Sequence, residues 1–567
     1  HVSASAVLGP ASHHTTSTPV PSWRQKLHTL RSRVLGRIPL ETTEFELVVE
    51  IALQTFQANK LSQLVASVWI NHLMAFVVIA NCCFRPLIHL AIPRPQYDPR
   101  RELLCLSVDT VLDIVYCLVI PFTIFYPYWR DIQPPHYAFP FEFYYRDDWY
   151  IRAIAENRQL FVTSWLDFLS KSTAAIGLAF RLLHIQRLIT LCCAQMQSPS
   201  VVPVRQSPVP PTPSSTRSLV HRRVFHALLI AWGLIVLGLH LHATTVAIHG
   251  ADRGCRLELR PWVSTKYTCA TFEVSCSQRR LTGQAAQIDK ALRRVDYNSL
   301  QVLIISNCPS LVMPDRLQTL SQLMMLKIYN STITEWNATA ALTADTHPNL
   351  QLLYITRTNM SGASVPEGML SSKFPPGLYD IEICVSNLQS LPDAVAEAWA
   401  ESLVYLFLEE APGISHVPSV LTRLPQLQVL SLSSDNITYI PDNLLANSTF
   451  FQLMFLNNPL QNLPESIGQL PIMLTLGIED TLVDDFPASW SIWETTPGWS
   501  PQNGNPISVY AIGTPLCQSL LHGAGVEDVH VATAQIGGFS IFCGDRAKNN
   551  HFYPLALEDA WRQTNRD

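Results

Sequence analysis

Residues 450–464 read FFQLMFLNNPLQNLP, and this stretch decides the fold of the second half of the chain. Its apolar residues Phe450, Leu453 and Phe455 follow one another at steps of three and two, and a Leu–Pro pair closes it. One such unit is too short to bury its own apolar side chains, so neighbouring units must stack to make a core. The same spacing recurs in copies that start at residues 300, 323, 350, 378, 403, 427 and 473.

This repeat resembles the leucine-rich repeat family, and the resemblance covers about residues 298–490. It implies that each copy contributes a short parallel strand to the inner face of a curved solenoid. The chain departs from the family three residues after the strand, where asparagine is usual. Only one copy has asparagine there; the eight residues are Cys308, Ser331, Thr358, Ser386, Ala411, Asp435, Asn458 and Thr481.

The first half of the chain holds nearly all of its long apolar stretches. The composition is 48% hydrophobic and only 15% charged, which is typical of a membrane protein. A spanning helix needs about 20 mostly apolar residues. We expect spans at 61–84, 103–126, 160–183 and 224–247. The predicted fold is thus about four transmembrane α-helices followed by an α/β leucine-rich repeat solenoid with short parallel strands.

These patterns divide the chain into seven segments. Residues 1–60 form a partly disordered N-terminal tail, 61–196 a three-span membrane region, and 197–221 a cytosolic linker rich in Pro and Ser. A last transmembrane helix (222–248) precedes a Cys-containing N-terminal cap (249–299). The repeats occupy 300–490, and a C-terminal cap and tail occupy 491–567.

Two signals place the repeats on the non-cytosolic side. Five N-glycosylation sequons all follow the last expected span, at Asn330, Asn337, Asn359, Asn436 and Asn447. Arginines precede that span, and positive charge favours the cytosol. With four spans the N-terminus would face outward, yet the tail 24–37 is basic and prefers the cytosol, so its side stays open. We expect a multi-pass protein of the plasma membrane.

Cysteines flank the repeats on both sides, and an oxidising compartment permits disulfides. Cys517 and Cys543 are the expected C-terminal pair, because no other cysteine lies near them in sequence. The N-terminal pairing stays open among Cys255, Cys269, Cys276 and Cys308. Cys384 falls on the predicted inner face and is expected to be free.

The variable positions of the predicted strands project from the concave face. Aromatic and charged residues together suit a binding patch, and a solvated face of ordinary composition is the alternative. The predicted ligand contacts are Tyr354, Arg357, Tyr379, Asp380, Glu382, Tyr405, Phe407 and Glu409.

A second group of polar residues lies within the expected spans. Asp109 and Asp113 share one helix face, as do Asp167 and Lys171. Charges in a bilayer are costly and mark either a structural ion pair or an ion pathway. We expect Lys171 to pair with a carboxylate across the bundle, more as a structural pair than as a conduction path.

Motifs for catalysis, metals and cofactors are not found: the chain has no Gly-rich phosphate loop, His-Glu-x-x-His or Gly-x-Ser-x-Gly. A net charge of -5 gives no reason to expect nucleic acid. We therefore expect a non-enzymatic, receptor-like or adhesion protein that contacts membrane lipid and binds a protein or glycan. The linker, with prolines at 208 and 211, offers a docking motif for a cytosolic partner. The alternatives are a channel or transporter regulated by the repeats, and a membrane-tethered scaffold.

The combination of a multi-span region and an external repeat domain also resembles a group of membrane proteins common among oomycetes.

Overall fold

The computed structural model describes residues 44–91, 99–133, 138–197, 213–445, 449–466, 475–487, 507–524, 533–536, 539–544 and 552–564. The described residues fall into two compact units. One combines parts of the N-terminal helices, and the other holds the repeats together with residues 57–75 and 121–163. The expected N-terminal tail up to residue 43 and most of the Pro-rich linker (198–212) lie outside the described residues.

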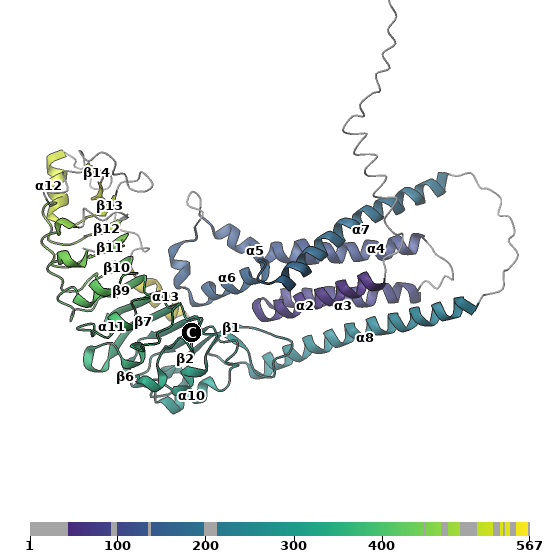
Figure 1. Cartoon of the computed structure of the whole chain (residues 1–567), viewed down its shortest axis with the longest axis horizontal. Coiled ribbons are helices and arrows are strands. Elements are labelled where there is room, and N and C mark those ends of the chain that lie inside the picture. Colours follow the sequence, from purple (N-terminus) through teal and green to yellow (C-terminus); the bar gives the residue numbers. More distant parts are fainter. Residues whose placement is uncertain are drawn as a thin grey trace, which may run out of the picture. The chain divides into compact units, whose positions relative to one another are not determined.

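The first half of the chain is helical (Figure 1). Within the described residues, three stretches are long and apolar enough to cross a membrane: Val68–Ala91, Arg101–Asp131 and Val220–Gly250. The third expected span falls in α7, which carries Asp167, Lys171 and Arg181 and does not meet this measure. The four-span count therefore remains a prediction. The helices are α2 (Glu44–Leu64), α3 (Val68–Ala91), α4 (Pro99–Ile114), η1 (Val115–Val119), α5 (Ile120–Asp131), α6 (Asp147–Leu160), α7 (Trp165–Gln197) and α8 (Pro213–Gly250).

The second half is built on one continuous sheet whose main path follows chain order from β1 to β13 and ends with β15 and then β14 (Figure 1). From β2 to β13 every neighbouring pair is parallel, as the repeat predicted; β1 and β14 close the two ends as antiparallel strands. The strands of this path are β1 (Cys255–Glu258), β2 (Cys269–Ser275), β3 (Val302–Ser306), β5 (Met325–Tyr329), β7 (Leu352–Met360), β8 (Asp380–Ser386), β9 (Tyr405–Glu409), β10 (Val429–Ser431), β11 (Gln452–Met454), β12 (Thr475–Gly477), β13 (Ile507–Tyr510), β15 (Phe539–Phe542) and β14 (Thr533–Ile536).

Short elements connect these strands. A second, smaller ladder joins β4 (Leu311–Val312) and β6 (Thr332–Glu335) to the end of β7. The remaining helical elements are η2 (Phe141–Tyr145), α9 (Cys276–Arg279), α10 (Ala285–Leu292), η3 (Asp315–Thr319), η4 (Ala338–Ala340), η5 (Ser361–Ala363), η6 (Glu367–Met369), α11 (Val395–Ala398), η7 (Ser419–Arg423), η8 (Asp442–Leu444), α12 (Pro515–Ala524) and α13 (Leu555–Thr564).

The backbone confirms the register of all eight copies. In each copy the seventh residue after the start has a positive φ, a rare conformation for a residue other than glycine. It marks the same backbone position in every copy, and the interval between these residues repeats the interval between copies. The eight residues are Asn307, Asn330, Arg357, Val385, Glu410, Ser434, Asn457 and Asp480.

Behind the sheet, the regular apolar positions form one core. Leu303, Leu326 and Leu353 pair in register on neighbouring strands and are fully buried. In two copies the missing asparagine is replaced by another side chain that bonds the neighbouring backbone. Ser331 accepts the N–H of Cys308 at 3.0 Å, and Asp435 accepts the N–H of Ala411 at 2.8 Å.

Three disulfides fasten the ends of this unit. Cys255–Cys269 joins the first two strands, and Cys276–Cys308 ties the N-terminal cap to the first repeat. Cys517–Cys543 closes the C-terminal cap and is the pair expected from the sequence. Cys384 is free and buried.

Candidate functional site

The concave face of the sheet is the natural place to look for a binding site. Its side chains form rows that run from strand to strand. One row pairs Ile304, Lys327, Tyr354, Glu382 and Phe407 in register. All five are buried, with no more than 3% of any residue exposed. Something must therefore cover this face.

The first cover is a segment from the N-terminal half, η2 and α6, which belongs to the same compact unit as the repeats. The Tyr145 hydroxyl donates to Glu382 Oε1 at 2.7 Å, and its ring stacks on that of Tyr354 with centroids 5.5 Å apart. Ile151 of α6 is fully buried in the same cluster. The segment thus contributes both apolar area and a polar contact to the concave face.

The second cover is α13 with the residues just before it. The backbone N–H of Tyr553 donates to Glu409 at 3.0 Å, and the Tyr553 ring packs edge-on against Tyr145. One turn into the helix, Asp559 forms an ion pair with Arg357, Nη2 to Oδ2 at 2.5 Å. The two covers therefore meet over the middle of the sheet.

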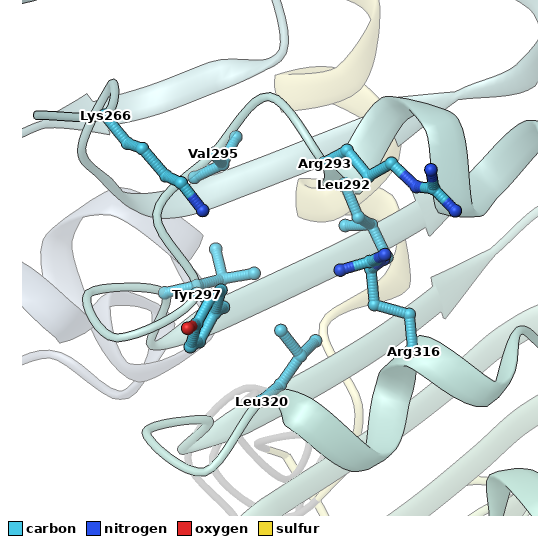
Figure 2. Close-up of a pocket in the computed structure, with 8 residues that line it drawn as sticks. Lys266, Leu292, Arg293, Val295, Tyr297, Arg316 and Leu320 are labelled. Atoms are coloured by element: carbon cyan, nitrogen blue, oxygen red, sulfur yellow. The ribbon is translucent and has the colours of Figure 1, made fainter.

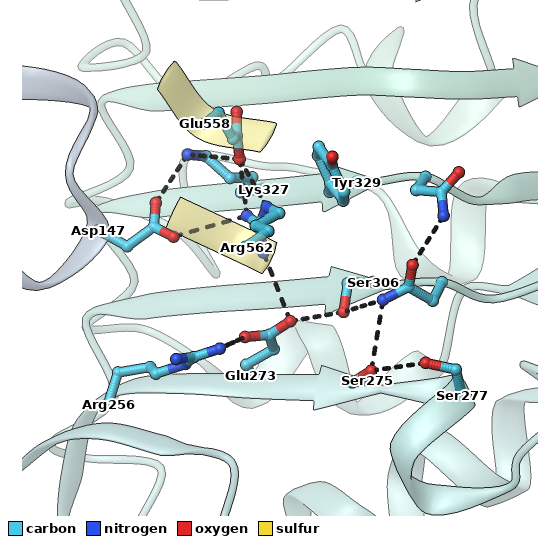
Figure 3. A network of polar contacts seen from close by, with 12 residues as sticks. Asp147, Arg256, Glu273, Ser275, Ser277, Ser306, Lys327, Tyr329, Glu558 and Arg562 are labelled. Carbon is cyan, nitrogen blue, oxygen red and sulfur yellow. Dashed lines mark hydrogen bonds and ion pairs between the residues drawn. The ribbon is translucent and has the colours of Figure 1, made fainter. Parts of the chain in front are cut away.

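A charge network holds both covers to the strands (Figure 3). Lys327 Nζ lies 2.7 Å from Asp147 of α6 and 3.2 Å from Glu558 of α13. Burial alone would lower the Lys327 pKa, yet these two carboxylates outweigh it and hold the pKa above its usual value. Lys327 is therefore a cation that the interior accepts because two acids contact it.

Arg562 is the second cation of this network. Its guanidinium lies 2.7 Å from Glu558, 3.5 Å from Asp147 and 3.4 Å from Glu273 on β2. It also sits over the Tyr329 ring, 4.2 Å from the centroid. Strand, α6 and α13 are thereby linked through a single side chain.

A cluster of acids beneath the covers has few cations nearby. Burial raises the pKa of Asp380 to about 7 and that of Glu409 to about 7. Burial and the neighbouring Asp380 raise the pKa of Glu382 well above its usual value. One oxygen of Asp380 and one of Glu382 are buried without a hydrogen-bond partner. This part of the face therefore favours protonated acids near neutral pH.

The eight predicted ligand contacts do lie on one face, but only some are accessible. Arg357 is exposed, and Tyr379 and Tyr405 are half-buried. The other five lie beneath the covers: Tyr354, Asp380, Glu382, Phe407 and Glu409. The sequence reading missed the covering residues Asp147, Glu558 and Arg562, as well as Lys327. The sequence did hold one sign that the concave face is covered: some variable strand positions are apolar, such as Val302, Met325 and Leu352.

Two of the recesses in the repeat unit have linings suited to binding a ligand. The larger, about 720 Å³, lies at the ends of the first strands. It is polar, and its lining includes Arg256, Ser275, Asn307, Asn330, Arg357 and Arg562. The smaller, about 310 Å³, is lined by Lys266, Tyr297, Arg293 and Arg316 around an apolar floor (Figure 2). Both of its arginines pair with Asp289, so their charge is partly offset.

The four described sequon asparagines, Asn330, Asn337, Asn359 and Asn436, are all exposed. Asn447 lies outside the described residues. Exposure is what attachment of a glycan requires, so these four side chains are sterically suitable acceptors.

The helical unit has its own polar cluster. Asp113 pairs with Arg181 of α7 at 2.8 Å, and Arg181 also pairs with Glu50 of α2. Asp109 lies 4.0 Å from Arg85. Lys171, expected to bridge helices, lies 3.1 Å from Asp167 one turn earlier on its own helix. An i, i+4 pair forms without help from another helix, and the sequence reading overlooked Arg181 as the bridging cation.

Among the described residues, no three His, Cys, Asp or Glu side chains gather as a metal site would require. No protein-family model matches the chain, and no curated protein matches it.

Solved structures give only distant likenesses. A leucine-rich repeat protein of Leptospira interrogans shares 17% identity over 40% of this chain and 72% of its own, with a TM-score of 0.27. A Listeria monocytogenes internalin-like protein shares 19% over 42% and 69%, with a TM-score of 0.29. Human trophoblast glycoprotein shares 15% over 42% and 86%, also at 0.29. Similarity at this level does not bear on function, which is inferred below from the chain's own residues.

Proposed function

We propose that this chain is a membrane-anchored leucine-rich repeat protein whose repeats bind a protein or glycan on the extracellular or lumenal side. Its role is receptor-like or adhesive rather than enzymatic. The observation that carries the proposal is the open polar recess of about 720 Å³ beside the concave face. Its guanidinium, amide and hydroxyl groups match the carboxylates and hydroxyls of peptides and sugars.

Three further features support an external repeat domain. The described residues include three helices that are long and apolar enough to span a membrane. The repeat unit contains three disulfides, which persist in oxidising compartments. Its described sequon asparagines are exposed, and two of them, Asn337 and Asn436, lie outside the lining of the recess, where a glycan would leave it open. Membrane lipid is then one partner, and the Pro-rich linker offers a site for a cytosolic one.

The deciding experiment is protease protection of intact microsomes, with and without enzymatic deglycosylation. We expect residues 250–567 to be protected and to lose mass on deglycosylation. Replacing the serine or threonine of each sequon by alanine is the matched control, because it removes the glycan and leaves the asparagine. Digestion of an unglycosylated repeat domain would refute the external placement and leave a membrane-tethered scaffold.

A channel or transporter is the second candidate, and the polar cluster of the helical unit favours it. Arg181 and Asp113 are nearly buried there, and Gln54 and Asn81 hydrogen-bond to each other at 2.6 Å. Reconstituted protein would then show a conductance that Asp113→Asn changes and that Lys373→Ala, on the exposed repeat surface, does not. If the reconstituted protein shows no conductance, the polar cluster has a structural role only.

A further inference from the structure

Helix α13 occupies a site that the strands have already built. Five strand residues contact α13 or Tyr553, two residues before it. They are called the docking strip: Glu273, Lys327, Tyr329, Arg357 and Glu409. They come from four strands, β2, β5, β7 and β9. The strip contacts one acidic pair, Glu558 and Asp559, and the arginine that follows it, Arg562.

These contacts are made by side chains and not by the sheet ladder. All strands of the described sheet lie before residue 543, so α13 contributes no strand to it. The backbone N–H of Tyr553, two residues before α13, donates to the carboxylate of Glu409 and not to a strand carbonyl. Departure of α13 would therefore break no strand pairing.

The strip also keeps its charges satisfied without α13. Lys327 retains Asp147 at 2.7 Å, and Glu273 retains Arg256 at 2.6 Å. Arg357 is already 38% exposed, so water can solvate it. A buried charge left alone would make departure costly, and Lys327, Glu273 and Arg357 avoid that cost.

Helix α13 also keeps an internal ion pair when it leaves the strip. Glu558 and Arg562 form an i, i+4 ion pair at 2.7 Å that a free helix can keep. Most of its contacts with the strip are charge-assisted, and a competing segment with the same groups can reproduce them. The aromatic and apolar residues Tyr553, Leu555 and Trp561 also pack on the concave-face cluster, so a competing segment must supply apolar area as well as charge.

We infer that the docking strip is a recognition site for a helical segment bearing a tyrosine, an acidic pair and an arginine four residues after the first acid. The chain's own α13 fills this site in cis, and a protein ligand with the same pattern displaces it. The inference deepens the proposed function, since it names the class of ligand and a surface for it. Displacement would uncover Arg357, Glu409 and the tyrosines around them.

Peptide exchange tests this directly on the full chain in detergent. A specific protease site is inserted between Gly544 and Phe552, the folded protein is cut, and a fluorescent peptide of residues 552–564 is added. We expect saturable binding by anisotropy, which the unlabelled peptide competes away. An Arg562→Glu peptide should bind at least about tenfold more weakly, because it would meet Glu273 and Asp147 with like charge. A Gln563→Ala peptide is the matched control, since Gln563 is exposed.

A charge swap distinguishes a loss of peptide recognition from misfolding of the variant protein. Arg357→Asp should weaken the wild-type peptide, and the Asp559→Arg peptide should recover binding to that variant. Position 357 has a positive φ, which aspartate tolerates well, so the variant should fold. Lys373→Ala, on a distant exposed pair, serves as the protein control.

Absence of exchange in fully cut protein, or equal binding of the Arg562→Glu peptide, would overturn the inference. Neither outcome would bear on the proposed external placement of the repeat domain, because the protease-protection assay measures that separately.

Discussion

Lys327 Nζ on β5 lies 2.7 Å from Asp147 Oδ1 of α6, a residue 180 positions earlier in the chain. The lysine side chain is 1% exposed. A buried cation persists only when its partners compensate for lost hydration. This pair therefore fixes the loop between the second expected span and α7 onto the repeats.

Replacing Lys327 by methionine should destabilise the repeat unit by about 3 kcal/mol, because Asp147 and the buried Glu558 would lose one of their two cations and keep only Arg562. Denaturant unfolding followed by intrinsic fluorescence measures the change. Lys373→Met is the control, since Lys373 and Asp345 form an exposed pair worth less than about 1 kcal/mol. Equal effects of the two substitutions would show that the Lys327 network adds nothing to stability.

The acid cluster should make stability depend on pH. The folded pKa values of Asp380 and Glu409 are about 7, above unfolded values of about 4. Protonation is thus favoured by folding, so this stabilisation is complete below about pH 4 and is lost as pH rises toward 7.

We accordingly expect a higher melting temperature at pH 5.5 than at pH 7.5, and Glu409→Gln should flatten that slope. Glu410→Gln, at the exposed neighbour, should leave the slope unchanged. Melting curves of both variants and the unsubstituted protein, recorded between pH 5.5 and pH 8, test this expectation. A temperature that rises steadily to pH 8 in both variants would contradict the raised pKa values.

Asp435 occupies the position where the repeat family uses asparagine, and its burial raises its pKa to about 8. One oxygen accepts the Ala411 N–H, while the other is buried without a partner. Asn458, at the same position of the next copy, donates from Nδ2 to Leu432 O at 2.6 Å. A neutral amide at 435 should make both contacts.

Asp435→Asn should therefore stabilise the unit by about 1–2 kcal/mol near pH 7.5. The gain should be smaller at pH 5, because the cost of protonating Asp435 on folding grows as pH rises from its unfolded pKa of about 4 toward its folded pKa of about 8. Denaturant midpoints at the two pH values measure it. The exposed Asp484→Asn is the matched control. Equal gains at both values would mean that the ionisation of Asp435 does not matter.

The repeats could be predicted from the sequence because their periodicity is local. Leu303, Leu326 and Leu353 occupy the same position of successive copies. Stacking copies so that these residues are buried together fixes the parallel register of the strands. The covers could not be predicted in this way. Tyr145 and Glu382 are 237 residues apart, and no period links them. The apolar Val302 and Met325 at variable positions were a sign of burial, yet they do not say which segment buries them.

The rate at which the Cys384 thiol reacts with maleimide measures whether the concave face is covered. The thiol is on the same row as Thr356 and Glu409, and the residue is 2% exposed. Burial and the neighbouring Glu409 raise its pKa well above the usual value, so little reactive thiolate exists at neutral pH. Maleimide should therefore label Cys384 at least about a hundredfold more slowly than a cysteine introduced at the exposed Glu410.

Peptide mapping by mass spectrometry distinguishes Cys384 from the cysteines of the helical unit. In protein cut between residues 544 and 552, an excess of a competing 552–564 peptide should leave Cys384 slow, because the replacement helix covers the same strip. Removal of the helix without replacement should speed labelling. Rapid labelling of the uncut protein would mean that the acids and tyrosines of the concave face are open to ligand without displacement of α13.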